Sequence, residues 1–495
     1  MLLEGLILSV TSATAGIILS FWGVEMAKSI LPSDLARVSS ISIDGRVLSV
    51  SIAVSILCGL LFASAPAWLA ARSNLIGLMK SSGGAIIGGR RRDRSLSGFL
   101  VGEIAFVCML IVATTLVVTS FILITTIDLG FDRQNIMTFS YRRSLENVTE
   151  GDRSAVAATL RNDLIERARA VPGVTHVAFS ENATAPMSGG SVRYSLEIPG
   201  LGETPREDML ETNMVTPDYF DAMGMQLLRG RLFEPTDRAG TTLVMVINDA
   251  AARKFFPGRD PLGQVVTFRG PTTIVGVLKN VHFDGPEADV RPAMYIPVDQ
   301  PYLGSVPTTV SGSLILRTNQ DPRLIAPAVQ SALRPALASL QPPSTSPEPD
   351  AVRFIDDYFA RMTATRRFNA GLMAGFGFIA IALGAIGVYG TMAFFVARQV
   401  RAIGLRMALG ASSSRVMRSV LGAAVGRVAL GTAIGLAGAW AVSNALTSYV
   451  FGIQPTDVRV YTGVGLLITV IGFSAALMPA LRAARLDPLT ALREE

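Results

Sequence analysis

The chain has 495 residues, of which half are hydrophobic and only 17% are charged, against about 25% in an average soluble domain. These values, with a mean hydropathy of +0.44, exclude a disordered, collagen-like or disulfide-stapled secreted chain and are unusual for a soluble enzyme. The 46 glycines and 7% aromatic residues make the apolar excess aliphatic and glycine-rich, which is typical of packed transmembrane helices. The net charge of +6 fits either nucleic-acid binding or basic cytoplasmic loops, and the distribution of the charge decides between them.

Six stretches are predicted to span a membrane, because each has about 20 mostly apolar residues. They are residues 6–26, 48–69, 99–124, 371–396, 421–446 and 461–481. The first is predicted to be a retained span and not a signal peptide, since it is long, carries Glu4 nearby and has no basic start.

Basic residues lie in alternate loops between these spans. They are Arg72, Lys80, Arg90, Arg91, Arg92 and Arg94 in the first basic loop, Arg398, Arg401, Arg406, Arg415 and Arg418 in the second, and Arg482, Arg485 and Arg493 at the end of the chain. The other short loops carry balanced charge. This alternation predicts that both chain ends face the cytoplasm, and it makes the positive charge topological and not a sign of nucleic-acid binding.

The block 129–367 has no span and is predicted to fold outside the membrane as an α/β domain. An amphipathic helix is expected over 156–168 and a second over 324–333, the latter with Asp321 as N-cap and Pro322 in its first turn. Strands are expected at 174–179, 243–247, 265–268, 273–278, 293–298 and 313–317, a proline-rich loop or hinge at 342–349, and a helix at 351–366 that leads into the fourth span. The predicted fold class is therefore an α-helical membrane protein with an α/β extracytoplasmic domain.

The cytoplasmic ends of the second and sixth spans carry matching sequence. Residues 66–72, which read Pro-Ala-Trp-Leu-Ala-Ala-Arg, align without a gap with residues 479–485, which read Pro-Ala-Leu-Arg-Ala-Ala-Arg. We therefore expect the first two spans to be the end of a unit that recurs complete later in the chain. The predicted parts are a two-helix remnant at 1–72, a basic cytoplasmic linker at 73–97, an anchor helix at 98–128, the outer domain at 129–367 and a three-helix membrane domain at 368–495.

The sequence lacks the usual residues of an enzyme or a metal site. No G-x-x-x-x-G-K-[ST] motif is present, and residues 83–90, the nearest glycine-rich stretch, lack its lysine. Cys58 and Cys108 fall within predicted spans and are interpreted as buried apolar residues, while His176 and His282 are isolated. We expect no catalytic residues, no metal and no cofactor bound by this chain.

Two charged residues fall inside predicted spans. Glu103 and Arg427 each lie near the cytoplasmic boundary, where a structural role is expected: Glu103 either extends its carboxylate to the membrane surface or pairs with Arg94.

The segment 398–411, which reads R-Q-V-R-A-I-G-L-R-M-A-L-G-A, is predicted to form a short basic helix parallel to the membrane between the fourth and fifth spans. Gly410 is expected to end this helix, and Ser412 to Ser414 to cap the next one. Such a helix suits docking of a cytoplasmic partner, and it suits anchoring to lipid head groups equally well.

This segment resembles the R-E-I-G-I-R-M-A-L-G-A loop of the FtsX-like ABC permeases of the macrolide-exporter (MacB) group. Further segments resemble the same family in the same order along the chain. They are 130–136, 215–224, 228–231, 246–248, 255–263, 274–277, 451–457 (F-G-I-Q-P-T-D) and 479–492. The duplicated arrangement resembles the duplicated orphan permeases described from acidobacteria. Such a protein carries an earlier periplasmic domain and a first coupling loop, so Met1 is interpreted as an internal start, a truncation or a shortened form.

The resemblance implies a multi-pass subunit of the bacterial cytoplasmic membrane with a large periplasmic domain. It implies a cytoplasmic ABC ATPase partner that hydrolyses ATP and a homo- or heterodimer, and it leaves open a periplasmic adaptor or an outer-membrane channel. The implied ATPase-coupling residues are Arg398, Arg401, Gly404, Arg406, Met407 and Gly410. The family has Glu where this chain has Ala402, so we expect a salt link to the ATPase to be missing.

Two functions follow from this reasoning. The first is a permease that couples ATP hydrolysis by a separate ATPase to movement of its periplasmic domain, for efflux or for extraction of an envelope substrate. The alternative is a non-transporting membrane scaffold that regulates a periplasmic cell-envelope enzyme.

Overall fold

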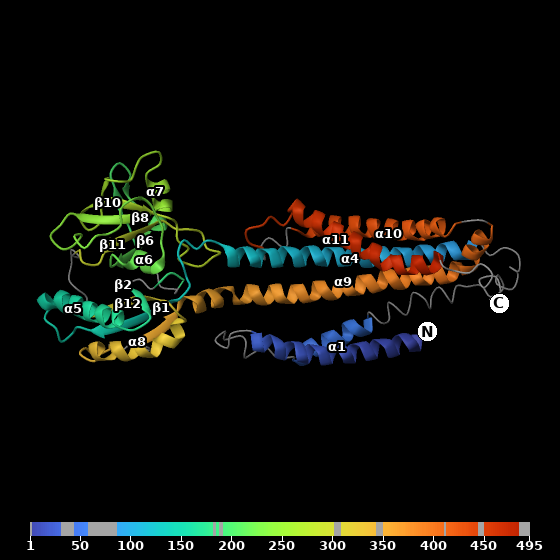
Figure 1. Ribbon diagram of the computed structural model, residues 1–495, viewed down its shortest axis with the longest axis horizontal. Helices are drawn as coiled ribbons and strands as arrows, with labels where there is room; N and C mark the ends of the chain where they lie inside the picture. The colour runs from blue at the N-terminus through green and yellow to red at the C-terminus, as the bar shows by residue number, and fades with distance from the viewer. Residues whose placement is uncertain are drawn as a thin grey trace. The chain divides into compact units, whose positions relative to one another are not determined.

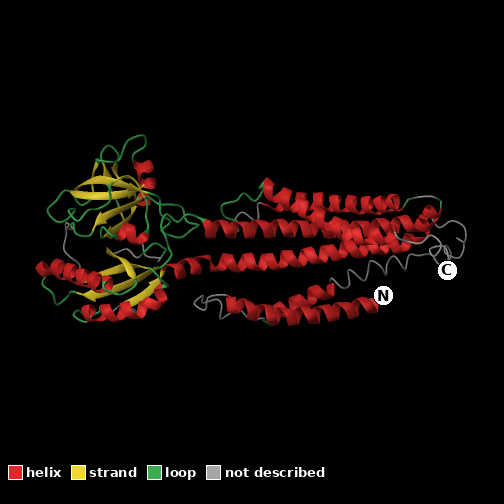
Figure 2. Cartoon of the chain, in the orientation of Figure 1, coloured by secondary structure: helices red, strands yellow, loops and turns green. Residues whose placement is uncertain are grey.

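The computed structural model describes residues 2–30, 44–57, 87–181, 185–187, 192–300, 308–342, 350–409, 412–443 and 450–484 (Figure 2). The chain divides into two compact units. The membrane unit comprises Met1–Leu123 and Ala364–Glu495, and the outer unit comprises Ile124–Thr363. The paired sequence at 66–72 and residues 343–349 of the expected proline-rich loop lie outside the described residues.

The helices of the described chain are labelled in Figure 1. They are α1 (Leu2–Ile30), α4 (Ile87–Thr126), α5 (Glu150–Arg169), α6 (Tyr219–Met223), α7 (Asp249–Phe255), α8 (Pro322–Leu337), α9 (Ile355–Ala408), α10 (Ser413–Val442) and α11 (Val458–Ala484), with a 3-10 turn at Arg206–Asp208. Residues Gly45–Leu57 form a further short apolar helix.

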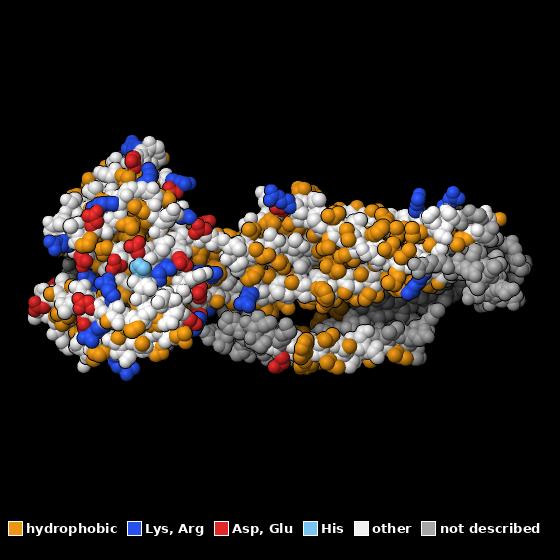
Figure 3. Space-filling model, viewed as in Figure 1, with side chains coloured by type: hydrophobic (Ala, Val, Ile, Leu, Met, Phe, Trp, Pro, Cys, Tyr) orange, Lys and Arg blue, Asp and Glu red, His pale blue; other side chains and the backbone are white. Residues whose placement is uncertain are grey.

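Four helical stretches among the described residues are long and apolar enough to cross a membrane. They are Ser97–Thr126, Ile355–Ala397, Ser413–Val442 and Val458–Ala484, and they correspond to the third to sixth predicted spans. Hydrophobic side chains spread over the visible surface of these helices, whereas charged side chains gather on the outer unit (Figure 3). The first two spans stay predictions, because part of the second lies outside the described residues and the apolar described stretch of the first is short.

The outer unit is built on a sheet of 13 described strands. They are β1 (Ile136–Ser144), β2 (Val174–Glu181), β3 (Arg193–Tyr194), β4 (Glu197–Ile198), β5 (Gly202–Glu203), β6 (Leu210–Val215), β7 (Leu227–Gly230), β8 (Leu243–Asn248), β9 (Val265–Thr267), β10 (Pro271–Leu278), β11 (Ala293–Pro297), β12 (Thr309–Thr318) and β13 (Asp350–Phe354). Their order is β13-β1-β12-β2-β6-β11-β8-β10-β9-β4-β5, with β3 beside β6 and β7 beside β10. The predicted α/β fold of this unit is confirmed.

The sheet has two lobes. In the first lobe, β13, β1, β12 and β2 are antiparallel, and α5 and α8 cover one face over a core that includes Leu164 and Val329. In the second lobe, β6 pairs in parallel with β11, and β8 pairs in parallel with β10, with α7 packed over a core that includes Met245 and Phe255. A third core, which contains Ala178 of the first lobe and Tyr295 of the second, is shared by both lobes.

Some element boundaries differ from the sequence-based expectation. Helix α4 begins at Ile87, so residues 87–97 of the predicted basic linker are helical. The helix expected at 351–366 starts later, because residues 351–354 belong to strand β13. Helix α9 begins at Ile355 and includes the rest of that helix and the fourth span. The N-cap prediction for α8 is confirmed: the Asp321 side chain accepts a hydrogen bond from the Arg323 N–H at 3.0 Å, and Pro322 opens the helix.

Candidate functional site

The predicted coupling residues lie at the end of α9. Arg398, Arg401, Gly404, Arg406 and Met407 have helical backbone, and α9 continues without a break to Ala408. The expected separate short helix is therefore the last part of one 54-residue helix. The structure does not describe the side chains of Arg398, Arg401 and Arg406, and it does not describe Gly410. The coupling role of these residues therefore stays a prediction.

Met407 is the coupling residue whose packing is described. Its side chain is half-buried against a small apolar cluster formed by Val416 and Ala483, with Val396 and Val420 also at its edge. These partners come from α9 itself, α10 and α11. The packing therefore holds the end of α9 against the two helices that follow it.

Helix α10 follows shortly after the end of α9 in the chain. Ser412 is the N-cap of α10, and its carbonyl accepts hydrogen bonds from the N–H groups of Arg415 at 2.9 Å and Val416 at 3.2 Å. The Ser412 hydroxyl lies 3.2 Å from the Ser414 hydroxyl. Ser412 therefore occupies the expected N-cap position, but its side chain makes no capping hydrogen bond to α10. Leu409, in the turn, is 80% exposed.

Two arginines contact α9 ahead of its coupling segment. The guanidinium of Arg427 on α10 lies 4.5 Å from the ring centroid of Phe395, and its Nε donates to the Ser97 hydroxyl of α4 at 3.0 Å. Arg482 on α11 donates to the Tyr389 hydroxyl at 2.9 Å. The structural role predicted for Arg427 is thus confirmed, because it links three helices.

Glycines bring the helices of the membrane unit into close contact. On α10, a Cβ at Gly431 would lie 2.8 Å from the Ile104 Cβ, and one at Gly435 would lie 2.5 Å from the Cys108 Cβ. Cys108 is fully buried there, as expected of an apolar role. On α11, a Cβ at Gly472 would lie 2.8 Å from the Val428 side chain. Helices α4, α10 and α11 therefore approach one another through residues that have no side chain.

Glycines also allow α9 to lie close to α4. The α9 glycines that face α4 side chains are Gly377 at Thr114, Gly384 at Val107 and Gly387 at Glu103. The Thr114 hydroxyl also donates to the Met373 carbonyl at 3.0 Å. The Glu103 carboxylate thus lies against bare α9 backbone, whereas its predicted partner Arg94 has a side chain outside the described residues.

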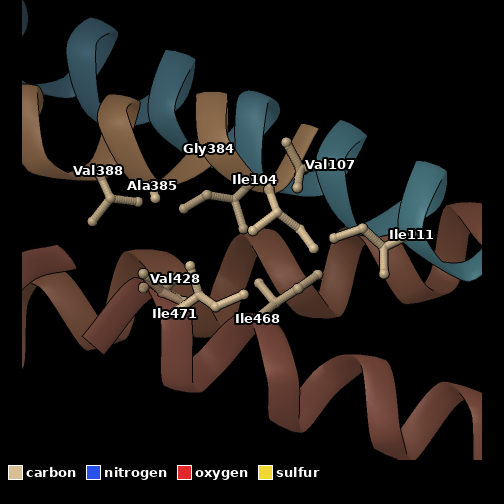
Figure 4. A pocket seen from close by; sticks show the side chains of 11 residues that line it. Ile104, Val107, Ile111, Gly384, Ala385, Val388, Val428, Ile468 and Ile471 are labelled. Atoms are coloured by element: carbon tan, nitrogen blue, oxygen red, sulfur yellow. The ribbon is translucent and has the colours of Figure 1, made fainter. Parts of the chain in front are cut away.

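A small void lies between α4, α9, α10 and α11 (Figure 4). It measures about 20 Å³, and its lining includes Ile104, Val107, Val388 and Ile468. A cavity of this size has room for a water molecule, but its lining is apolar and gives water too few polar partners to stay. This gap between the four helices is therefore apolar.

The described part of the outer unit contains no group of three or more metal-binding side chains. His176 lies on β2 with its Nδ1 3.2 Å from the Thr175 hydroxyl, and His282 lies in the loop after β10 with its Nδ1 3.2 Å from the Ala288 carbonyl oxygen. The two histidines remain as separate as the sequence indicated.

The sequence reasoning missed the arginine contacts and the glycine pairing. The spacing Gly431-x-x-x-Gly435 was a signal for close helix packing, because it places two glycines on one helix face. No comparable signal pointed to Ser97, Tyr389 or Phe395, since their roles depend on which helices are neighbours.

Two family models match the chain in succession. Residues 108–336 match the MacB-like periplasmic core domain, and residues 374–488 match the FtsX-like permease C-terminal domain. The first match covers most of the outer unit, and the second covers α9 from residue 374 onward together with α10 and α11.

Similar proteins come from Gram-negative and Gram-positive bacteria. The macrolide export ATP-binding/permease protein MacB of Neisseria gonorrhoeae is 27% identical over 355 residues, which cover 70% of this chain and 51% of that protein. The uncharacterized ABC transporter permease YknZ of Bacillus subtilis is 26% identical over 371 residues, which cover 73% of this chain and 86% of that protein. The chain spans about half the length of the MacB relatives that it matches.

Two solved structures resemble parts of the chain. The periplasmic region of MacB from Actinobacillus actinomycetemcomitans is 18% identical with a TM-score of 0.31, and the alignment covers 46% of this chain and 92% of that one. The extracellular domain of YknZ is 19% identical with a TM-score of 0.27, and the alignment covers 44% of this chain and all of that domain.

The two domain matches, in the order in which they occur, agree with the apolar helices and the α/β unit described above. They describe a multi-pass protein of the cytoplasmic membrane whose outer unit is a periplasmic core domain. The chain belongs to the FtsX-like ABC transporter permeases of the MacB type.

Proposed function

We propose that this chain couples ATP hydrolysis by a separate cytoplasmic ATPase to movement of its outer unit, and that this movement drives efflux or extraction of an envelope substrate. The chain has no nucleotide-binding motif of its own, so the ATP would be bound by the partner subunit. A dimer of permease chains is part of the proposal.

The observation that carries the proposal is the continuity of α9. This helix begins at Ile355 in the outer unit and ends at Ala408 in the coupling segment, without a break. A continuous helix is a stiff element, so a push at one end reaches the other with little loss. Its coupling end is held by Met407, and Arg427 and Arg482 contact the helix about three and five turns earlier, at Phe395 and Tyr389.

Ala402, which stands where the family has Glu, limits the contacts that could dock the ATPase. Without the family's carboxylate at this position, docking would depend on Arg401, Arg406 and the shape of the helix end. Arginine suits such a surface, because its planar guanidinium pairs with carboxylates in two parallel hydrogen bonds.

Affinity purification of the full chain from its own membranes tests this proposal. We expect a nucleotide-binding protein to co-purify, and the Arg401→Ala/Arg406→Ala variant to bind it about tenfold more weakly, the loss expected for one charge-assisted contact. Arg459→Ala is the matched control, since Arg459 is exposed at the start of α11, away from the coupling segment. Wild-type chain that carries no nucleotide-binding protein, or a double variant that binds it normally, would contradict the proposal.

A further inference from the structure

Both connections between the membrane helices and the outer unit enter one core. The segment that follows α4 buries Leu129 and Phe131, and the first turns of α9 bury Ile355 and Phe359. All four side chains belong to the core that the two lobes share. A movement of either segment therefore acts directly on the packing between the lobes.

Arg133 joins these two segments to each other. It follows α4 in the chain, and its guanidinium carbon lies 3.8 Å from the ring centroid of Phe359 on α9. Its Nε also lies 3.8 Å from the Oδ1 of Asp356 in the first turn of α9. A cation stacked on an aromatic ring and paired with a carboxylate is held from two directions.

The neighbouring ion pairs attach each segment to a lobe instead. Asp132 accepts a hydrogen bond from Arg317 of β12 at 2.7 Å, and Asp128 pairs with Lys279 after β10. On the α9 side, Asp357 pairs with Arg323 of α8. Arg133, by contrast, contacts α9 directly and so links the two segments to each other.

The strands of the two lobes pair with each other over a short length. Strands β2 and β6 pair only at Ser180 with Val215 and at Glu181 with Met214, whereas β1 pairs with β12 along its whole length. Two ion pairs bridge the lobes at the rim, Arg161 with Asp299 and Arg169 with Asp218. A ladder of two residue pairs is a suitable hinge, because few backbone hydrogen bonds must change when it bends.

We propose that Arg133 is a positioning residue that makes the two entering segments move as one body, so that a displacement of α4 or α9 changes the angle between the lobes about the β2–β6 pairing. This inference rests on the proposed function, since it assumes that an ATPase displaces α9. It adds the element that converts the displacement into a change of shape within the outer unit.

Spin-label distance measurements on the full chain with its co-purified ATPase, in lipid nanodiscs, test the inference. Labels are placed on Asn162→Cys in the first lobe and Gln264→Cys in the second, both exposed positions, in a Cys58→Ser/Cys108→Ala background. A non-hydrolysable ATP analogue is added to wild type, Arg133→Ala and Arg133→Lys. The matched control is Arg229→Ala, which removes an exposed ion pair with Asp260 elsewhere on the outer unit.

We expect the analogue to shift the distance between the lobes in wild type and in Arg229→Ala. In Arg133→Ala the shift should fall by about two- to tenfold while ATP hydrolysis stays within about twofold of wild type, and Arg133→Lys should keep most of the shift. Asp356→Asn, which retains the Arg133–Phe359 stacking, gives a second variant with a smaller loss. Thermal unfolding of each variant checks that its fold is intact.

A full shift in both Arg133→Ala and Asp356→Asn would overturn the inference, as would an equal loss in Arg229→Ala. A wild-type complex that hydrolyses ATP without any change between the lobes would also overturn it and leave the ATPase partnership standing. A chain that carries no ATPase fails at the earlier purification step, which contradicts the proposed function and this inference with it.

Discussion

Gly387 of α9 lies directly against the side chain of Glu103 on α4. A Cβ at position 387 would lie 2.5 Å from the Glu103 Oε2, closer than any real contact allows. The absence of a side chain at this one position therefore lets a carboxylate fit between two membrane helices.

Gly387→Ala is expected to lower the stability of the membrane unit by about 1 kcal/mol, the low end of overpacking costs, because the new methyl group meets the end of the flexible Glu103 side chain, which can rotate away. Thermal unfolding of the detergent-solubilised chain measures the loss. Gly390→Ala is the control, since a Cβ at Gly390 meets no atom within 4 Å. Adding Glu103→Ala to Gly387→Ala should restore most of the stability, and a double variant as unstable as Gly387→Ala would show that the contact is not the cause.

Gly435→Ala is expected to separate α10 from α4, since its methyl group would meet the Cβ of Cys108 at 2.5 Å and the backbone of Ala105. Backbone atoms cannot move aside as a flexible side chain can, so a cost of at least about 2 kcal/mol is expected. Cys108 is fully buried in the native packing, so separation of the two helices should expose it. In a Cys58→Ser background, Cys108 should then react faster with a maleimide than it does without Gly435→Ala. Gly426→Ala, which meets no atom within 4 Å, should change neither property, and an unreactive Cys108 in Gly435→Ala would count against the predicted separation.

The outer unit should lose stability in acid through Asp237. Hydrogen bonds from Arg231 hold the pKa of this carboxyl below its usual range against the opposing effect of burial, with a further hydrogen bond from the Glu234 N–H. A lowered folded-state pKa means that the stabilisation is fully present above the ordinary Asp value of about 3.9 and is lost as the pH falls through the folded pKa. Hydrogen exchange of residues 230–237 measured as a function of pH follows this loss.

Asp237→Asn should cost about 1–3 kcal/mol near neutral pH and remove most of this acid dependence, because one charge-assisted pair is lost. Asp260→Asn provides the comparison, since Asp260 is largely exposed in its pair with Arg229. Equal acid sensitivity in Asp237→Asn and wild type would assign the dependence to other carboxylates.

Met407→Ala should loosen the end of α9. The truncation leaves a gap beside Val416 and Ala483 and removes about two methylene equivalents of buried apolar surface, so faster hydrogen exchange is expected over residues 398–409. Val458→Ala is the control, because Val458 is exposed at the other end of the helices. Unchanged exchange at the end of α9 would mean that Met407 does not hold it in place.

The sequence predicted those parts of the fold that depend on local pattern. Apolar runs identified the membrane helices α4, α9, α10 and α11, amphipathic spacing identified α5 and α8, and short apolar segments identified β2, β8 and β10. The short helices α6 and α7 were not predicted. Strand β6 was missed because its buried residues Glu211, Thr212 and Asn213 are polar. A buried strand is recognised in the sequence by its apolar residues, and these three positions carry none.

The contacts within the site could not be predicted in the same way. The coupling segment was located by its resemblance to a family, but its continuity with α9 depends on the whole helix and not on the segment. The pairing of Gly387 with Glu103, and of Arg133 with Phe359, requires knowing which helices are neighbours, and spacing along one chain does not contain that information.

Site-specific crosslinking from Leu409 tests the central claim most directly, since this exposed residue lies in the turn that the ATPase would contact. The full chain carrying Leu409→Cys, or Val458→Cys at the opposite end of the helices, is treated in native membranes with a short thiol-to-amine crosslinker. We predict that Leu409→Cys forms an adduct with a nucleotide-binding protein, that ATP changes its yield, and that Val458→Cys forms none. Absence of this adduct from Leu409→Cys, or the same adduct from both positions, would contradict the account.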